Sequence, residues 1–218
     1  MSSTQVPLSG ADAAVIGLVA FAAVSFGFGW RIIRHTGVMA HEGAHAIVGS
    51  LLFLKVSGIV INSNATGVTT MNSGGCLSTI LAGFAGYVGP SLFGLGAARL
   101  IEFGHIVTVL WITLFLLGVL LVGIRWSFGM FSVIVVGGLV YLIGRYAPVS
   151  GQIIAAYAIA WLLLLTGVRQ ILEYGVNAGD AGILAGRTGI PRLIWFLLWL
   201  AATLGAVAVG GSMLVMRH

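Results

Sequence analysis

Long apolar runs separated by short polar breaks dominate this chain. Each run is near the roughly 20 residues that a helix needs to cross about 30 Å of hydrocarbon. The second and fifth runs are the shortest, so the pattern predicts six or seven transmembrane segments. The runs cover residues 13–30, 38–54, 77–100, 106–122, 128–144, 153–172 and 192–216.

Two stretches interrupt the apolar pattern. Residues 55–75 are polar, β-branched and turn-rich, which predicts two short strands joined by a turn. Residues 174–191 end at Pro191, which suits the first turn of a final helix. A continuous apolar composition leaves no room for the alternation of a membrane barrel. We therefore predict an all-α, polytopic membrane helical bundle with a β-hairpin-like re-entrant or covering stretch at about 55–75.

Composition and charge narrow the class of protein further. Hydrophobic residues make up 59% of the chain and charged residues 7%, against about 25% charged residues in soluble domains. This excludes a soluble enzyme, a disordered chain and a disulfide scaffold. The net charge is +5, but the basic residues stand singly near the ends of apolar runs. They indicate membrane anchoring rather than binding to nucleic acid.

The sequence His-Glu-Gly-Ala-His at residues 41–45 carries the strongest chemical signal. On a helix, His41 and His45 lie four residues apart on one face, so both imidazoles can reach one metal ion. Glu42 lies beside that face and can act as general base toward water on a zinc ion. Ionisable groups within an apolar helix cost about 2.5–3.5 kcal/mol each and need a shared partner. The alternative is that these residues form a short polar patch at the end of the helix and contact lipid headgroups instead of a metal ion.

A catalytic zinc usually takes three protein ligands and keeps one open position. Asp180 is favoured as the third ligand, because no basic residue lies within six positions of it. Glu173 follows Arg169 by four residues, so an ion pair on one helix face accounts for it. The full set of candidates comprises the ionisable residues outside the motif: Asp12, His35, Glu102, His105, Glu173, Asp180 and His218.

The segment Gly-Tyr-Val-Gly-Pro at residues 86–90 has two interpretations. Small residues allow close packing between membrane helices. Alternatively, the segment breaks the helix and lets substrate or water approach the zinc, since Pro90 would kink the helix there. The sequence leaves both open.

These features together resemble the site-2 protease family of intramembrane zinc metalloproteases, in particular a compact bacterial branch. The resemblance rests on HEGAH in an apolar helix, the strand-like stretch, NSGG at 72–75, GYVGP at 86–90 and the region after residue 180. It covers roughly residues 35–200. One departure is that Ala181 follows Asp180 where better-known members have glycine, and Asn177 precedes no proline.

The resemblance implies a zinc-dependent endopeptidase that cuts in or near a transmembrane segment of a membrane-protein substrate, as in regulated intramembrane proteolysis. It implies a multi-pass protein of a bacterial plasma membrane, with the lipid bilayer as its second partner and residues 1–218 as one metalloprotease-like domain. The implied roles are Glu42 as catalytic base and His41, His45 and Asp180 as Zn²⁺ ligands. Substrate or structural support is assigned to Asn72, Gly86, Gly89, Pro90 and Asn177.

Two other functions stay open at this stage: a metal-binding membrane transporter or sensor, and a family member that binds helices without cutting them. A transporter would tend to have internal repeats or paired broken helices, which we do not find in the sequence. The intact HEGAH motif argues against a non-cleaving member.

The predicted site raises a problem of topology. If all seven runs crossed the membrane, HEGAH and Asp180 would lie on opposite faces of the bilayer, and five basic residues would lie on each side. Two solutions exist. The second run enters only part of the way and residues 55–75 fold back, or the fourth and fifth runs provide one crossing fewer.

Overall fold

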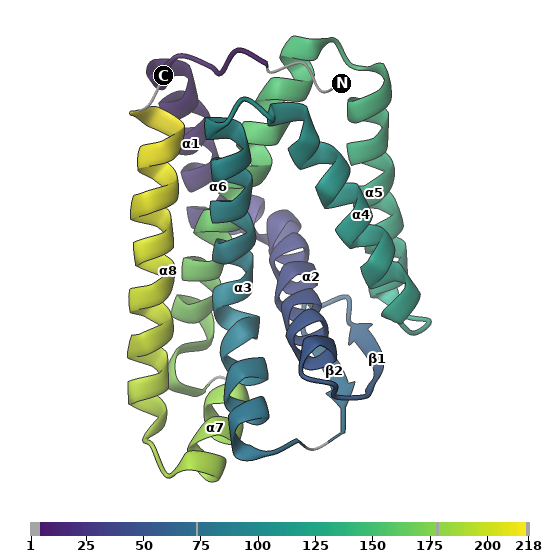
Figure 1. Cartoon of the computed structure of the whole chain (residues 1–218), viewed down its shortest axis with the longest axis vertical. Coiled ribbons are helices and arrows are strands. Elements are labelled where there is room, and N and C mark those ends of the chain that lie inside the picture. The colour runs from purple at the N-terminus through teal and green to yellow at the C-terminus, as the bar shows by residue number, and fades with distance from the viewer. Residues whose placement is uncertain (1–4, 73, 178, 217–218) are drawn as a thin grey trace.

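The computed structural model describes residues 5–72, 74–177 and 179–216. Ser73 of the NSGG segment and the candidate ligand His218 therefore lie outside the described residues. The described residues form eight α-helices, one short 3-10 helix and a two-stranded sheet (Figure 1). The elements are α1 (Gly10–Ser25), α2 (Gly27–Leu51), β1 (Val56–Ile61), β2 (Gly67–Met71), α3 (Cys76–Glu102), α4 (Ile106–Gly123), α5 (Phe128–Tyr146), α6 (Val149–Tyr174), η1 (Gly175–Asn177), α7 (Gly179–Thr188) and α8 (Arg192–Val215).

The predicted helical membrane bundle is confirmed. Five helices, α3, α4, α5, α6 and α8, are each long and apolar enough to cross a membrane. Helices α1 and α2 qualify only as a pair, bent by 97° at a short break. By length and composition, the described chain thus has five candidate spans, or six when the bent pair counts as one. Six is the lower number of the predicted range.

The bend between α1 and α2 resolves the problem of topology. Phe26 interrupts the helix with an extended backbone. Gly29 permits the tight corner, because a Cβ atom there would lie 2.4 Å from the Ala23 carbonyl oxygen. Helix α2 therefore runs at a steep angle to α1, and the hairpin connects its end to the start of α3. As a result the hairpin, α7 and the end of α2 lie together at the end of the bundle opposite the two termini (Figure 1).

Small residues let the central helix α3 pack closely against its neighbours. A Cβ atom at Gly94 would lie 2.6 Å from the backbone nitrogen of Leu164 on α6. Ser91, fully buried on α3, donates a hydrogen bond of 2.9 Å to the Leu164 carbonyl. Such small residues allow backbones to approach in membranes, where packing rather than the hydrophobic effect holds helices together.

The predicted hairpin at 55–75 is present, and its two strands differ in how they are covered. Ile59 of β1 lies opposite Thr69 of β2 in the antiparallel register. The outer edge of β1 is bridged by the α4–α5 loop, where Arg125 N–H donates to the Ile59 carbonyl at 2.8 Å. The turn is held by Tyr174, whose hydroxyl donates to the Ala65 carbonyl at 3.3 Å. In the described chain, no other element bridges the outer edge of β2.

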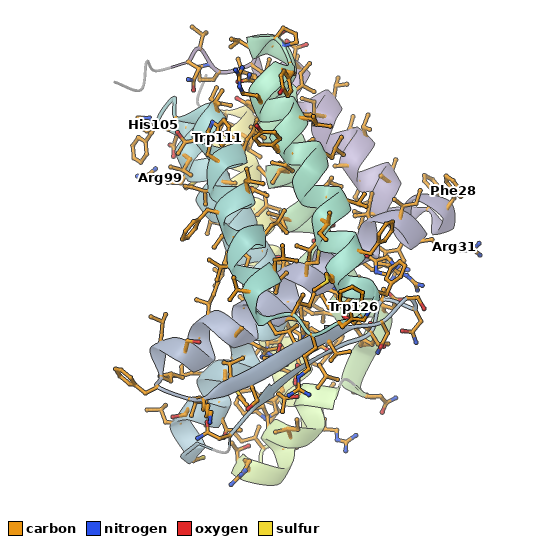
Figure 2. The ribbon with its side chains drawn as sticks, turned by 90° about the vertical axis from the view of Figure 1, so that its right-hand side faces the viewer. Phe28, Arg31, Arg99, His105, Trp111 and Trp126 are labelled. Atoms are coloured by element: carbon orange, nitrogen blue, oxygen red, sulfur yellow. The ribbon has the colours of Figure 1, made fainter. Side chains whose placement is uncertain are left out.

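Basic residues are unevenly distributed between the two ends of the bundle. Arg99 lies toward the end with the termini, whereas Arg31 lies at about the middle of the bundle's height (Figure 2). Arg145, in the last turn of α5, shares the end of Arg99. Because one predicted crossing is replaced by a bend, the equal division of basic residues no longer holds. The basic residues in or next to loops at the hairpin end are Lys55, Arg125, Arg187 and Arg192.

Candidate metal centre

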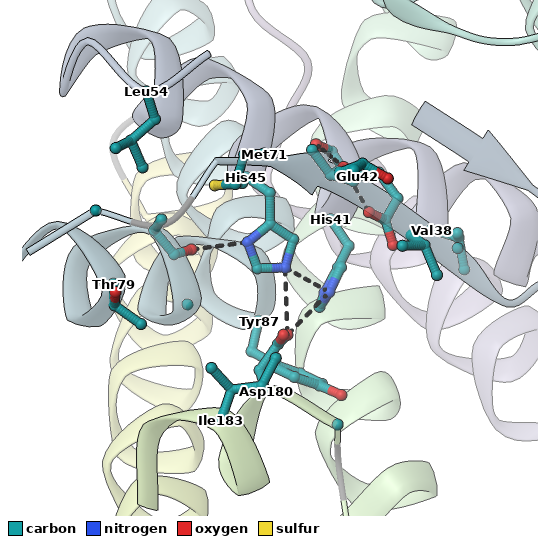
Figure 3. Close-up of a pocket in the computed structure, with 18 of the residues that line it drawn as sticks. Val38, His41, Glu42, His45, Leu54, Met71, Thr79, Tyr87, Asp180 and Ile183 are labelled. Carbon is teal, nitrogen blue, oxygen red and sulfur yellow. Dashed lines mark hydrogen bonds and ion pairs between the residues drawn. The ribbon is translucent and has the colours of Figure 1, made fainter. Parts of the chain in front are cut away.

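Helix α2 brings the two histidines of the HEGAH motif to one point. The Nε2 atoms of His41 and His45 lie 3.1 Å apart, and their rings meet at 81°. Both side chains point from one face of α2 toward α7 (Figure 3). One helical turn separates the two residues, so the local geometry of the helix alone aligns them.

The structure places Asp180 beside this pair, as the sequence prediction requires. Its Oδ2 atom lies 3.2 Å from His45 Nε2 and 3.4 Å from His41 Nε2. Asp180 stands in the first turn of α7, where the helix dipole favours a negative charge. Burial raises the pKa of this carboxyl, but the imidazoles of His41 and His45, which donate to it and carry charge when both ring nitrogens are protonated, outweigh burial and hold the pKa below its ordinary value.

The spacing of these three atoms fits a zinc ion. Ligand atoms about 2.0–2.1 Å from one ion, at tetrahedral angles, lie about 3.3–3.4 Å from one another. The observed separations are 3.1, 3.2 and 3.4 Å. Two imidazole nitrogens and one carboxylate oxygen also form a donor set that leaves a fourth position open. His41, His45 and Asp180 are thus a group that could hold one metal ion.

Residues of helix α3 contact both imidazoles and fix their orientation. His45 Nδ1 lies 2.7 Å from the Ala82 carbonyl oxygen. A carbonyl only accepts hydrogen bonds, so the proton is on Nδ1 and Nε2 is left for the metal. The His41 ring packs edge-on against Tyr87, with centroids 4.6 Å apart, and Tyr87 in turn packs against Trp199.

The glycines of the segment at 86–90 make room for the site. A Cβ atom at Gly86 would lie 2.2 Å from His45 Nε2 and 2.8 Å from His41 Cε1. A Cβ atom at Gly89 would lie 2.3 Å from the Ala44 Cβ atom. Helix α3 continues through Pro90 without a break. Close packing, not a helix break, is therefore the correct interpretation of this segment.

Glu42 is buried between α2 and β2, with 3% of its surface exposed. Thr69 Oγ1 donates a hydrogen bond of 2.6 Å to Glu42 Oε2. A Cβ atom at Gly67 would lie 2.4 Å from the other oxygen, Oε1, so only glycine fits there. Neither Thr69 nor Gly67 was predicted from the sequence. Their signal was the alternation along β2, which turns Gly67, Thr69 and Met71 inward and leaves Val68 and Thr70 exposed.

The other candidate ligands among the described residues lie outside the group that could hold a metal ion: Asp12, His35, Glu102, His105 and Glu173. Asp12 accepts a hydrogen bond of 2.7 Å from Ser9 at the start of α1. Glu102 forms an ion pair with Arg99. Asn177, a predicted supporting residue, is exposed in η1 and does not line the cavity at the site.

The predicted ion pair between Glu173 and Arg169 is wrong. It is not among the ion pairs of the described residues. Instead Trp30 Nε1 donates to Glu173 Oε2 at 2.6 Å, and the Arg169 guanidinium lies over the Trp30 ring. The indole of α2 thus stands between the two charges, because its N–H and its ring face satisfy them separately.

Asn72 closes the open end of the hairpin. Its Oδ1 atom accepts a hydrogen bond of 2.7 Å from the Lys55 backbone N–H. Asn72 also lines the cavity beside His41, His45 and Asp180, which has a volume of about 640 Å³. The walls of this cavity come from α2, β2, α3 and α7. It is within the size range of pockets that bind small molecules or peptide side chains.

The fold and the site therefore define an integral membrane protein in which two histidines and one carboxylate, a group that could hold a metal ion, lie beside a cavity. The sequence model of the Peptidase M50B-like family matches residues 14–210, so the chain belongs to this family of metalloproteases. The resemblance to site-2 proteases is thereby confirmed. Neither the search of curated proteins nor the search of solved structures found a match.

Proposed function

We propose that the protein is an intramembrane zinc endopeptidase that hydrolyses a peptide bond in or near a transmembrane segment of a membrane-protein substrate. One observation carries the proposal: His41, His45 and Asp180 converge within 3.4 Å in the membrane bundle of a peptidase family. A zinc ion held there supplies Lewis-acid chemistry, polarising a carbonyl oxygen and making a water molecule more acidic.

Glu42 serves as the general base. Its carboxylate accepts one proton from the attacking water as the new C–O bond forms. It gives that proton to the amine nitrogen as the C–N bond breaks, so the carboxylate is restored after each turnover. A transporter or sensor has no need of a buried carboxylate between two metal-binding histidines, which favours hydrolysis over that alternative.

The open edge of β2 holds the substrate in an extended form. Residues 66–72 line the cavity in front of the metal ligands. A peptide added as a third strand would have its backbone hydrogen-bonded by β2, and its carbonyl groups would pass near the site. A transmembrane helix of the substrate must unwind locally to pair in this way, because helical backbone groups are already bonded to one another.

The metal site is tested by comparing two acidic residues. Asp180→Ala is expected to reduce zinc content to less than about a tenth and to abolish cleavage, since it removes a charged ligand. Glu173→Gln is expected to leave both unchanged, because glutamine keeps an acceptor for Trp30 Nε1. Zinc per purified chain is measured by elemental mass spectrometry, and cleavage with a quenched fluorescent peptide that carries an apolar transmembrane segment.

The opposite result for these two variants would assign a different residue as the third metal ligand. Full zinc content and full cleavage in Asp180→Ala, with both lost in Glu173→Gln, would make Glu173 the ligand. Zinc retained by a His41→Ala, His45→Ala double variant would remove the proposed site altogether.

The orientation of the site in the membrane is a further prediction. Positive residues favour the cytoplasmic side, so we expect the hairpin end, with Lys55, Arg125, Arg187 and Arg192, to face the cytoplasm.

Cys76 is a natural probe of this orientation. It is exposed, it stands at the first residue of α3, and it is the one cysteine of the chain. An impermeant maleimide is expected to label it only after the membrane is permeabilised. In a Cys76→Ser background, Ser150→Cys, at the opposite end of the bundle, should be labelled in intact cells. Labelling of Cys76 in intact cells, without labelling of Ser150→Cys, would show that the protein has the opposite orientation.

A further inference from the structure

Thr69 is connected to the catalytic centre through its side chain. Its hydroxyl lies 2.6 Å from Glu42 Oε2 and 3.2 Å from the Glu42 carbonyl oxygen. A hydroxyl has one proton, and the shorter contact to a charged acceptor is the stronger. The Thr69 hydroxyl therefore donates to the carboxylate and fixes the direction of one of its two oxygens. Gly67 leaves the space that the other oxygen occupies.

The backbone of the same residue faces the open edge of the sheet. Ile59 lies directly opposite Thr69. The Ile59 carbonyl accepts from Arg125 N–H, so it points away from β2. In an antiparallel pair, opposite residues either bond to each other or both point outward. The backbone N–H and C=O of Thr69 therefore point away from β1, at the open edge of β2, and Thr69 is one of the residues that line the cavity.

We propose that Thr69 is a positioning residue that holds Glu42 in register with a substrate strand bound along β2. This inference rests on the proposed function. A peptide that pairs with the outward backbone groups of Thr69 is placed relative to the same residue whose hydroxyl aims the carboxylate. Thr69 thereby fixes the distance between the bound peptide and the base, which would otherwise depend on a flexible glutamate side chain.

Valine is nearly isosteric with threonine and keeps the backbone, so Thr69→Val removes the hydroxyl alone. Its backbone still pairs with the peptide, so KM is expected to change less than twofold. A misaligned base costs turnover, so kcat is expected to fall about 10- to 100-fold. Thr69→Ser restores the hydroxyl and is expected to reach at least about a third of the wild-type kcat.

The test uses the purified full chain with zinc in detergent micelles and the quenched fluorescent transmembrane peptide as probe. Thr108→Val is the matched control, since Thr108 on α4 does not line the cavity. It should leave kcat, KM and zinc content unchanged. Zinc content is measured for every variant, so that loss of the site is separated from loss of alignment.

Three results would overturn the proposal. They are a wild-type kcat in Thr69→Val, a Thr69→Ser variant as slow as Thr69→Val, and a zinc content that falls in proportion to kcat. The last result would make Thr69 a structural support of the site. If the wild-type protein, fully loaded with zinc, cleaves no peptide, the proposed function itself fails, and this is distinct from a normal enzyme that is insensitive to Thr69.

Discussion

Glu42→Gln is expected to reduce peptide hydrolysis by about 10²- to 10⁴-fold while leaving zinc content unchanged. General base catalysis contributes a factor of this size. Glutamine has nearly the same shape as glutamate, and its carbonyl oxygen can still accept the hydrogen bond from Thr69. It has no basic oxygen to take a proton from water, so the chemistry is lost while the packing against β2 is kept.

The measurement is the turnover of the quenched fluorescent transmembrane peptide, together with zinc per chain. Glu173→Gln is the matched control, because it makes the same chemical change at a glutamate outside the cavity lining. Activity of Glu42→Gln within tenfold of the wild type would remove Glu42 from the role of base. Loss of zinc from Glu42→Gln would mean that the residue supports the metal site instead.

Gly86→Ala is expected to empty the metal site, although it adds only one methyl group. The new Cβ atom would lie 2.2 Å from His45 Nε2, the atom proposed to bind the zinc ion. Alanine favours a helix over glycine by about 1 kcal/mol. Helix α3 itself is therefore not weakened, and the loss would arise from the clash. Zinc content and cleavage are both expected to fall to less than about a tenth of the wild-type values.

Gly96→Ala provides the control for this experiment on the same helix. No atom lies within 4 Å of a Cβ atom at Gly96, so alanine should be accepted with full zinc content and activity. Thermal unfolding of both variants checks that the bundle is intact. A Gly86→Ala protein that binds zinc and cleaves peptide like the wild type would show that α3 does not press on the imidazoles.

The sequence predicted the parts of the site that depend on local geometry. His41 and His45 share a face because of helix periodicity alone, and a run of five residues suffices to see it. Asp180 is 135 residues from His45, so no periodicity connects them. It was found by elimination and by resemblance, and its role as a ligand stays a prediction although the structure brings it to the pair.

Other features depend on tertiary contacts that no local pattern encodes. Apolar runs indicate that helices cross a membrane, but they do not indicate the angle between two of them, so the bend at Phe26 was not foreseen. The ion pair expected for Glu173 failed for a related reason. Spacing on one helix identifies neighbours on that helix, whereas Trp30 reaches Glu173 from another.

Tertiary contacts also distinguish the two interpretations of residues 86–90, a helix break and close helix packing. A glycine that breaks a helix and a glycine that lets a neighbour approach look alike in a sequence. The two differ in what lies opposite, and opposite Gly86 lie the imidazoles of α2.

The bridge between Ile59 and Ile124 has a consequence for how this small sheet avoids self-association. A two-stranded sheet has two edges, and each exposed edge is a template on which another chain can pair. The α4–α5 loop occupies the edge of β1, where the Arg125 guanidinium also donates to the Ser57 carbonyl. Two copies that met through β2 would each present a blocked strand to the next copy, so pairing would stop at two chains and could not propagate into a fibre.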